Sequence, residues 1–387
     1  MLTNALRALA ALVCLFVLPG VARAQAPGTA CLPVDPAAFS CPSAAFQPCG
    51  IAVEGATRHY CRHIPDQGGV LPVVIAFHGA GAGADAMVNL WRYRAEQGMI
   101  ILVPDAHETG QEGVCSSIWR QIGFQAQDWA GLAAPYGCAG GSGLSDLAFV
   151  EALMDAPEAE RAVQGFYAAG FSAGAGFVFQ LYLTAPLAER FAGFAAAGMG
   201  MSAAKMRAVE PEARGTGRYG LNRSARRPFL FHMGTADKFS LPVETIVAEL
   251  QRHPRCAEPG SIYAAMRCVL FNPIGQERGN FDLTSQRRMT EKWLAAFNRT
   301  LPRRIESLYP DLGAGEGGDE TMTVRADYLP AEGGAPVAVL TTLDGGHDWP
   351  GWGGNQAPCG SRMCDVDLTQ EILQFWRATA GMVTPPR

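Results

Sequence analysis

A series of short, almost continuous apolar runs constrains the fold of this chain more than any other feature of its sequence. Such runs are typical of strands buried on both faces, as in a parallel sheet covered by helices. Stretches with a helical spacing of apolar residues lie between several of them. The sequence therefore predicts an α/β fold, with a mostly parallel sheet and helices on both faces. The predicted strands are Val70–Phe77, Met99–Val103, Gly165–Ala169, Phe191–Ala197, Pro228–Met233 and Val337–Leu343.

Outside these strands, the pattern predicts helices, one hairpin and two long loops. No internal repeat or compositional break divides the chain, so residues 25–387 are expected to form one domain. Long loops are expected at 106–145 and 299–335. The first contains Trp119, and loops of that length are usually functional, so we expect it to wall a binding cleft. The helices are predicted at Leu144–Met154, Ala173–Thr184 and Leu368–Ala378, and the hairpin at Gly50–Val53 and Thr57–Ile64.

The first residues have the pattern of a secretory signal peptide. Arg7 supplies a positive charge, Ala8–Leu18 is apolar, and Ala22-Arg23-Ala24 provides a small-residue cleavage site. A transmembrane anchor is the alternative, but the apolar run is shorter than the roughly 20 residues that a bilayer requires. We therefore expect residues 1–24 to be removed and the protein to be secreted or periplasmic.

Charge and composition exclude some classes of partner. The formal net charge is −5 and only 17% of the residues are charged, which gives no long-range attraction for nucleic acid or an anionic membrane. Neutral substrates suit such a surface. With 387 residues, 48% of them hydrophobic, the chain can build its own core, and a monomer is expected.

The cysteines predict disulfides. Removal of residues 1–24 takes Cys14 away and leaves an even number, as expected for an exported, disulfide-bonded chain. Zinc is the alternative, since Cys359 and Cys364 have a suitable spacing, but no second such pair accompanies them. Metal ions and organic cofactors are therefore not expected. Short-range pairing predicts Cys31 with Cys41, Cys49 with Cys61, Cys115 with Cys138, Cys256 with Cys268, and Cys359 with Cys364.

A nucleophile motif lies between a predicted strand and a predicted helix. Gly170-Phe171-Ser172-Ala173-Gly174 matches G-x-S-x-G, in which a sharp turn exposes the serine at the carboxyl edge of a sheet. Bulky residues two positions before or after the serine would clash in this turn. The helix N-terminus behind Ser172 favours developing negative charge.

A serine hydroxyl needs a base, and in this arrangement the base lies downstream of the serine. Three histidines satisfy that order. His232 lies inside an apolar strand, where a core histidine is the better interpretation, and His253 lies in a polar stretch. His347 follows the strand Val337–Leu343 on a loop at its carboxyl end, so it is the candidate base.

The acid that orients the base is expected between the serine and the histidine in sequence. Asp237 lies just past the carboxyl end of the strand Pro228–Met233, on the edge where Ser172 is expected. Asp282 and Asp311 follow no buried strand, and Asp348 is too close in sequence to His347 to reach back to it. An aspartate after a strand is often only a turn residue or helix cap, but the order favours Asp237.

Two backbone amides are expected to bind the oxyanion of an acyl-transfer intermediate. One follows the nucleophile, at Ala173, and the other lies in the loop after an earlier strand, at Ala80. His78 precedes the glycine turn of that loop. We expect it to shape the oxyanion loop, and we group it with the residues near the substrate.

Together these segments resemble the polyhydroxybutyrate depolymerase and feruloyl esterase family of α/β-hydrolases. The resemblance rests on His78-Gly79, the nucleophile motif, Gly234-Thr235-Ala236-Asp237 and, most specifically, Gly346-His347-Asp348-Trp349-Pro350-Gly351. It implies a disulfide-bonded α/β-hydrolase fold with Ser172, Asp237 and His347 as a catalytic triad. It also implies substrates that are esters of hydroxyacids, as polymer or oligomer, or of plant phenolic acids.

Departures from the family pattern leave the substrate open. Met233 stands where the family usually has histidine, and no substrate-binding module follows the domain. Trp349 and Trp352 either line an acyl site or pack under the His347 loop. A serine peptidase on the same scaffold is an alternative, because the triad does not decide which bond is cleaved. A non-catalytic binding protein that keeps the hydrolase shell is another, although it would be expected to lack part of the motif set.

Overall fold

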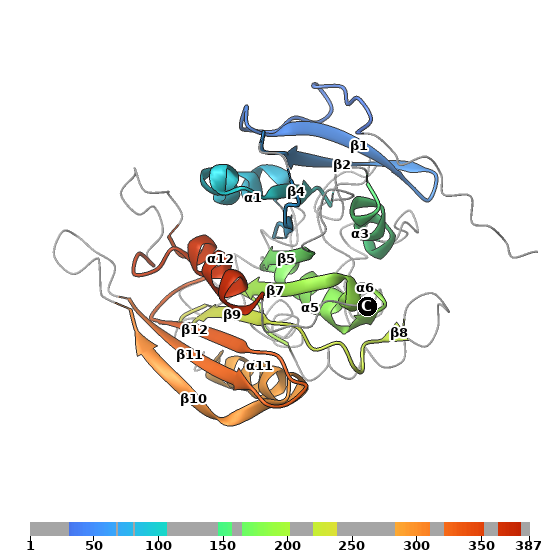
Figure 1. The fold of residues 1–387 in the computed structure, drawn as a ribbon. Coiled ribbons are helices and arrows are strands. Elements are labelled where there is room, and N and C mark those ends of the chain that lie inside the picture. Colours follow the sequence, from blue (N-terminus) through green and yellow to red (C-terminus); the bar gives the residue numbers. More distant parts are fainter. Residues whose placement is uncertain are drawn as a thin grey trace, which may run out of the picture.

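The computed structural model describes residues 31–66, 69–79, 82–106, 146–156, 165–201, 220–237, 283–309, 321–351 and 363–380. Among these residues, ten strands form one sheet in the order β1-β2-β4-β3-β5-β7-β9-β12-β11-β10 (Figure 1). The strands are β1 (Gln47–Val53), β2 (Ala56–His63), β3 (Val73–Phe77), β4 (Ile100–Pro104), β5 (Phe166–Phe171), β7 (Phe191–Ala197), β9 (Phe229–Gly234), β10 (Thr300–Leu308), β11 (Met322–Pro330) and β12 (Val337–Leu343). A separate short pair joins β6 (Thr184–Ala185) to β8 (Gly220–Leu221).

The centre of the sheet is parallel and its two ends are antiparallel. Strands β4, β3, β5, β7, β9 and β12 run parallel to one another. Each coincides with a predicted apolar run, because strands covered on both faces carry little polar sequence. The predicted hairpin is β1–β2, which joins the sheet antiparallel to β4. The predicted α/β fold is therefore confirmed.

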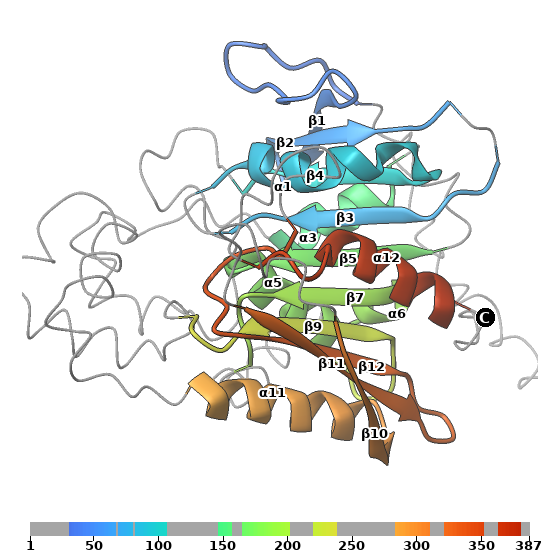
Figure 2. The same cartoon turned by 90° about the vertical axis from the view of Figure 1, so that its left-hand side faces the viewer.

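Helices cover both faces of the sheet (Figure 2). One face packs against α1 (Ala84–Trp91) and α12 (Leu368–Thr379), which contribute Trp91 and Trp376 to its core. The 3-10 helix η1 (Arg92–Gln97) continues α1. The other face packs against α3 (Asp146–Met154), α5 (Ala173–Leu183) and α11 (Leu283–Phe297). The short helix α6 (Leu187–Arg190) follows α5. None of the described helices is long and apolar enough to cross a membrane.

The prediction of a long loop at 299–335 is wrong. Strands β10 and β11 occupy most of it and form an antiparallel hairpin that pairs with β12. Strand β10 is exposed along nearly its whole length, so it has neither an apolar run nor an apolar alternation to reveal it. The other predicted loop, 106–145, lies outside the described residues apart from Ala106.

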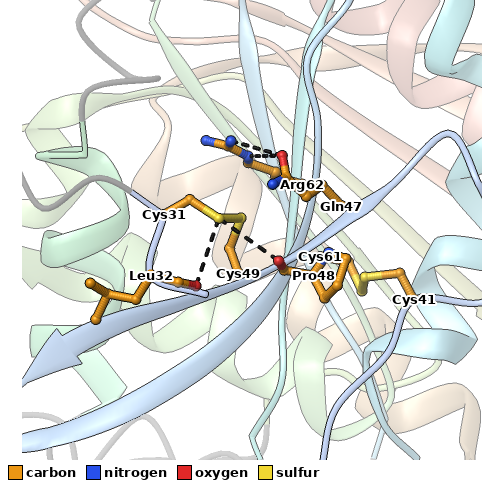
Figure 3. The surroundings of a disulfide bond; sticks show 8 residues. All are labelled: Cys31, Leu32, Cys41, Gln47, Pro48, Cys49, Cys61 and Arg62. Atoms are coloured by element: carbon orange, nitrogen blue, oxygen red, sulfur yellow. Dashed lines mark hydrogen bonds between the residues drawn. A yellow bond between two sulfur atoms is a disulfide. The ribbon is translucent and has the colours of Figure 1, made fainter. Parts of the chain in front are cut away.

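The predicted pairings of Cys31 with Cys41 and of Cys49 with Cys61 are also wrong. The structure joins Cys31 to Cys49 and Cys41 to Cys61 (Figure 3). In the β1–β2 ladder Cys49 lies opposite Tyr60, so the next residue, Cys61, points to the other face of the sheet. Each disulfide therefore fastens residues 31–41 to a different face of the hairpin. Cys364 is disulfide-bonded too, whereas Cys115, Cys138, Cys256, Cys268 and Cys359 lie outside the described residues.

Candidate functional site

The carboxyl ends of the parallel strands place the chemically interesting residues at one edge of the sheet. Ser172 directly follows β5, Asp237 follows β9, and His347 follows β12. The His78-Gly79 turn follows β3, which is the neighbour of β5. Ligand sites of open α/β sheets lie outside this edge, and it is the edge that the sequence predicts.

Ser172 sits on a strained turn between β5 and α5. Its backbone has φ 53° and ψ −116°, a combination that an L-residue rarely adopts and that costs on the order of 1–3 kcal/mol. Hydrogen bonds hold the turn, from the Ser172 amide to the Ala197 carbonyl (2.8 Å) and from the Gly176 amide to the Ser172 carbonyl (3.1 Å). The turn presents the hydroxyl to His347, whose Nε2 lies 2.9 Å from Ser172 Oγ.

The glycines on either side of Ser172 are required by crowding. A Cβ atom at Gly170 would lie 2.3 Å from the Gly174 carbonyl oxygen. A Cβ atom at Gly174 would lie 2.2 Å from the carbonyl oxygen of Phe77, at the end of β3. The steric reason given for the motif from the sequence therefore holds, and Gly174 also lets α5 approach the neighbouring strand.

The structure brings Ser172, His347 and Asp237 into one hydrogen-bonded chain. His347 Nε2 lies 2.9 Å from Ser172 Oγ, and its Nδ1 lies 2.8 Å from Asp237 Oδ2 and 2.9 Å from Oδ1. The Asp237 side chain is fully buried and that of His347 is 13% exposed. A carboxylate accepts hydrogen bonds but cannot donate them, so Nδ1 carries the hydrogen and Nε2 presents a lone pair to the serine hydroxyl.

Close contacts between the loops after β9 and β12 set the positions of Asp237 and His347. A Cβ atom at Gly234 would lie 2.2 Å from the Gly345 carbonyl oxygen, and the Ala236 amide donates to that oxygen at 2.9 Å. Thr235 Oγ1 accepts from the Asp344 amide at 2.8 Å. The two loops thus pack backbone to backbone, and this packing fixes the distance between the carboxylate and the imidazole.

Gly198 and Asp105 are site residues that the sequence reasoning missed. Gly198 has φ 72°, and a Cβ atom there would lie 3.2 Å from His347 Cε1 and 2.9 Å from the Phe171 ring. Asp105 lies 3.8 Å from His78 and accepts from the Ala84 amide at 3.3 Å. Each directly follows a buried parallel strand, the same signal that indicated Asp237.

His78 is fully buried and shapes the turn beside the nucleophile. The Ala106 amide donates to its Nε2 at 3.0 Å, so its Nδ1 carries the hydrogen and donates to the Gly79 carbonyl at 2.8 Å. A Cβ atom at Gly79 would lie 3.2 Å from Ser172 Cβ. The grouping of His78 with the substrate-binding residues is wrong, because no part of its side chain reaches the surface.

Trp349 packs under the His347 loop instead of lining a substrate site. It is 3% exposed, its Nε1 donates to Thr369 Oγ1 at 3.0 Å, and its ring meets the edge of Phe171 at 6.2 Å between centroids. This burial and these contacts favour the packing alternative over the acyl-site alternative. Ala173 lies at the first position of α5, directly after the nucleophile. Ala80, Trp119 and Trp352 lie outside the described residues.

His232 is a core histidine, as its apolar strand predicts. It is fully buried in β9, and its Nε2 lies 3.0 Å from Thr342 Oγ1 of β12. Burial lowers the pKa of His232 to about 4, and the negative charge of Asp237 opposes this shift only in part. Burial also raises the pKa of Asp348. His253 lies outside the described residues, and within the described ranges no group of His, Cys, Asp and Glu side chains could hold a metal ion.

Comparisons with known proteins add distant structural likenesses. No protein-family model matches the chain, and the search of characterised proteins finds no significant match. A serine hydrolase homologue from Coxiella burnetii is 13% identical (TM-score 0.32; 53% of this chain, 81% of that chain). A predicted CIB-like hydrolase from Thermoplasma acidophilum is 16% identical (TM-score 0.33; 54% and 82%). A cold-adapted esterase from an Arctic intertidal metagenomic library is 16% identical (TM-score 0.34; 51% and 76%).

The fold assignment follows from the chain itself. The strand order, the sharp turn that carries Ser172, and the sequence order of serine, aspartate and histidine after β5, β9 and β12 are those of the α/β-hydrolase fold. The disulfides of the β1–β2 hairpin fit this fold without disturbing its central strands.

Proposed function

We propose that this protein is a secreted serine esterase that hydrolyses carboxylic esters through an acyl-enzyme. The observation that carries the proposal is the hydrogen-bonded chain from Asp237 through His347 to Ser172, at the sharp turn after β5. The strained backbone and the glycines that permit it are difficult to explain in a protein that uses no nucleophile. Disulfides on both faces of the hairpin support an oxidising compartment, as secretion requires.

The first half-reaction forms the acyl-enzyme. Ser172 Oγ attacks the ester carbonyl carbon while its proton moves to His347 Nε2. The buried carboxylate of Asp237 stabilises the imidazolium that results and holds the ring in place. The oxyanion forms near the N-terminus of α5, where the Ala173 amide and an amide of the loop that contains Ala80 are proposed to donate to it. Collapse breaks the bond to the alcohol oxygen, which takes the proton from His347.

The second half-reaction releases the acid. Water gives a proton to His347 Nε2 and attacks the acyl carbon, and the second tetrahedral intermediate then expels Ser172 Oγ, which regains its proton from the imidazolium. No step requires a metal ion or an organic cofactor. Esters of hydroxyacids, such as hydroxybutyrate polymers or oligomers, and feruloyl-type esters are the proposed substrates, on the strength of the motif resemblance around His347.

Substitution of the nucleophile tests the proposal. Ser172→Ala is expected to lower kcat on short p-nitrophenyl esters by at least about 10⁴-fold and to abolish labelling by a fluorophosphonate probe. Ser224→Ala, at an exposed serine, is the matched control and should retain both. Undiminished activity in Ser172→Ala would refute the mechanism. Cleavage of peptide amides but not of hydroxybutyrate or feruloyl esters would replace the esterase by a peptidase, and binding without turnover would indicate the non-catalytic alternative.

A further inference from the structure

The two ends of the sheet are protected to very different degrees. At one end, the backbone of Leu32 exchanges two hydrogen bonds with Gly50 of β1, each 2.9 Å long, and most of β1 is buried. At the other end, β10 is the last strand of the sheet (Figure 1), and every residue after Thr300 in this strand is exposed. Exposed edge strands readily pair with another chain, so this edge requires an explanation.

Apolar side chains are concentrated at this edge, on both faces of the sheet. Ile305 is 52% exposed and Leu308 is 60% exposed. Ile305 lies opposite Asp327 and Leu308 lies opposite Val324, so their side chains point to opposite faces. A ligand bound against one face would cover only one of them. A strand added to the edge would cover both.

The backbone of β10 has the groups needed to add such a strand. The Tyr309 amide donates to the Thr323 carbonyl at 3.0 Å, so these two residues form a hydrogen-bonded pair of the β10–β11 ladder. This pair shows which residues of β10 bond to β11 and which do not. Hydrogen-bonded and non-hydrogen-bonded pairs alternate in an antiparallel ladder. Ile305 and Ser307 therefore face β11 with their N–H and C=O groups, and Arg304 and Glu306 direct theirs outward.

The side chains beside Ile305 favour a second copy of the same strand. If two β10 strands pair antiparallel about a twofold axis at Ile305, Arg304 of each chain lies opposite Glu306 of the other. Opposite charges at facing positions stabilise a sheet, whereas like charges destabilise it. An axis one residue later, at Glu306, would place two glutamates opposite each other. Of these two registers, charge favours the one centred on Ile305.

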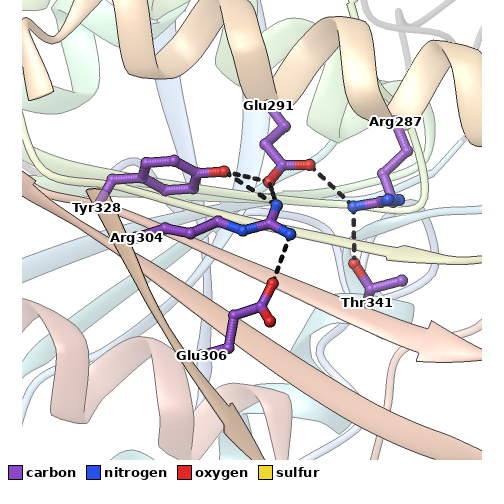
Figure 4. A network of polar contacts seen from close by, with 6 residues as sticks. All are labelled: Arg287, Glu291, Arg304, Glu306, Tyr328 and Thr341. Atoms are coloured by element: carbon purple, nitrogen blue, oxygen red, sulfur yellow. Dashed lines mark hydrogen bonds and ion pairs between the residues drawn. The ribbon is translucent and has the colours of Figure 1, made fainter. Parts of the chain in front are cut away.

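Both charged side chains are available for these contacts. Within one chain, the Arg304 guanidinium lies 3.0 Å from Glu291 and 2.5 Å from Glu306 (Figure 4). Arg304 is nevertheless 48% exposed and Glu306 51% exposed. Glu291, which also accepts from Arg287 and Tyr328, is almost fully buried and anchors Arg304 at its position on the strand.

We propose that two copies of this chain associate through their β10 strands, in the register centred on Ile305, to form one continuous sheet. The interface is a single pair of strands, so it lies at the low end of interface sizes and gives a weak dimer, formed at micromolar concentrations or above. Pro302 lacks an N–H group, so it cannot donate a hydrogen bond to the partner strand near the start of β10. The pairing is therefore limited to the middle of the strand. This replaces the monomer expected from the sequence and is independent of the catalytic proposal.

Sedimentation velocity over a concentration series tests the association. The wild-type protein should shift from monomer to dimer as its concentration rises through the micromolar range. Glu306→Arg places arginines opposite each other, and Glu306→Pro removes an outward N–H while keeping the ladder to β11. Each should weaken dimerisation by at least about tenfold. Glu96→Arg, a charge reversal at an exposed residue of η1, is the control and should leave it unchanged.

Cysteine trapping tests the register. The twofold axis places the two Ile305 Cα atoms about 4.5 Å apart, within reach of a disulfide. The two Ser307 residues lie about 13 Å apart along the strands. Ile305→Cys should therefore form a covalent dimer under mild oxidation, and Ser307→Cys should not. A protein that stays monomeric at all concentrations overturns the proposal, as does a dimer that neither Glu306 variant weakens or that Ser307→Cys traps as readily as Ile305→Cys.

Discussion

His232 is expected to make the stability of this protein depend on pH. Its imidazole is buried in β9, and burial lowers its pKa from 6.5 to about 4. The folded protein therefore keeps His232 neutral at a pH where the unfolded chain has already bound a proton. Because the unfolded state binds more protons between these two values, the free energy of unfolding falls as the pH falls from about 6.5 to about 4. Well above pH 6.5, His232 is neutral in both the folded and the unfolded state and no longer makes the free energy of unfolding depend on pH.

The magnitude follows from the size of the pKa shift. One pKa unit corresponds to about 1.4 kcal/mol, so the full shift corresponds to about 3 kcal/mol. About 2 kcal/mol of this should already be lost between about pH 7.5 and about pH 5. For a protein with a typical stability of about 5–15 kcal/mol, such a loss is readily measured.

Urea denaturation of wild type and His232→Gln at both pH values checks this prediction. Glutamine does not titrate and can keep a hydrogen bond to Thr342 Oγ1, the partner of His232. The variant should lose about 2 kcal/mol less than the wild type on acidification. Ser224→Ala, at an exposed serine that does not titrate in this range, is the control and should keep the wild-type loss. An equal loss in wild type and His232→Gln would refute the reasoning.

Three further predictions concern residues around the site and the hairpin. Gly174→Ala should prevent folding or cost more than about 3 kcal/mol in a thermal or urea melt, because its Cβ would lie 2.2 Å from the Phe77 carbonyl oxygen. Cys41→Ala should cost about 3 kcal/mol of stability under oxidising conditions, since its disulfide with Cys61 spans 20 residues. Trp349→Phe should cost about 1 kcal/mol through the lost bond to Thr369. Its KM for short esters should stay the same, because the ring does not reach the surface.

The parallel core of the fold could be predicted because burial on both faces leaves a continuous apolar signal. Strands β7 and β12 match their predicted bounds to the residue. Strand β10 could not be predicted, because its residues lie in solvent and their sequence carries no periodic constraint. The hairpin it forms with β11 is held by backbone pairing and by the polar contacts of Glu291 on α11, and neither leaves an apolar pattern in the sequence.

Short sequence separation misled the prediction of the disulfides. It measures the cost of closing a loop, but it does not say which face of a strand a cysteine occupies. Cys49 and Cys61 close a compact loop, yet the ladder pairs Cys49 with Tyr60 and Cys61 with Pro48, which places the two cysteines on opposite faces. The side-chain period of two excludes this pair only in the observed register, in which Val53 pairs with Ala56 and Cys49 with Tyr60.

Strand topology brings together the three residues that meet in the candidate site, but it does not decide which way a side chain after a strand points. Ser172, Asp237 and His347 each follow a parallel strand, and the strands bring them to one edge whatever the loops between them contain. Whether an aromatic side chain lines the site or packs beneath it depends on how its loop turns, and sequence position does not determine that. The Trp349 indole follows His347 by only two residues, yet it points into the core against Phe171. Topology therefore makes the reacting groups predictable from the sequence, and the substrate contacts follow from loop geometry.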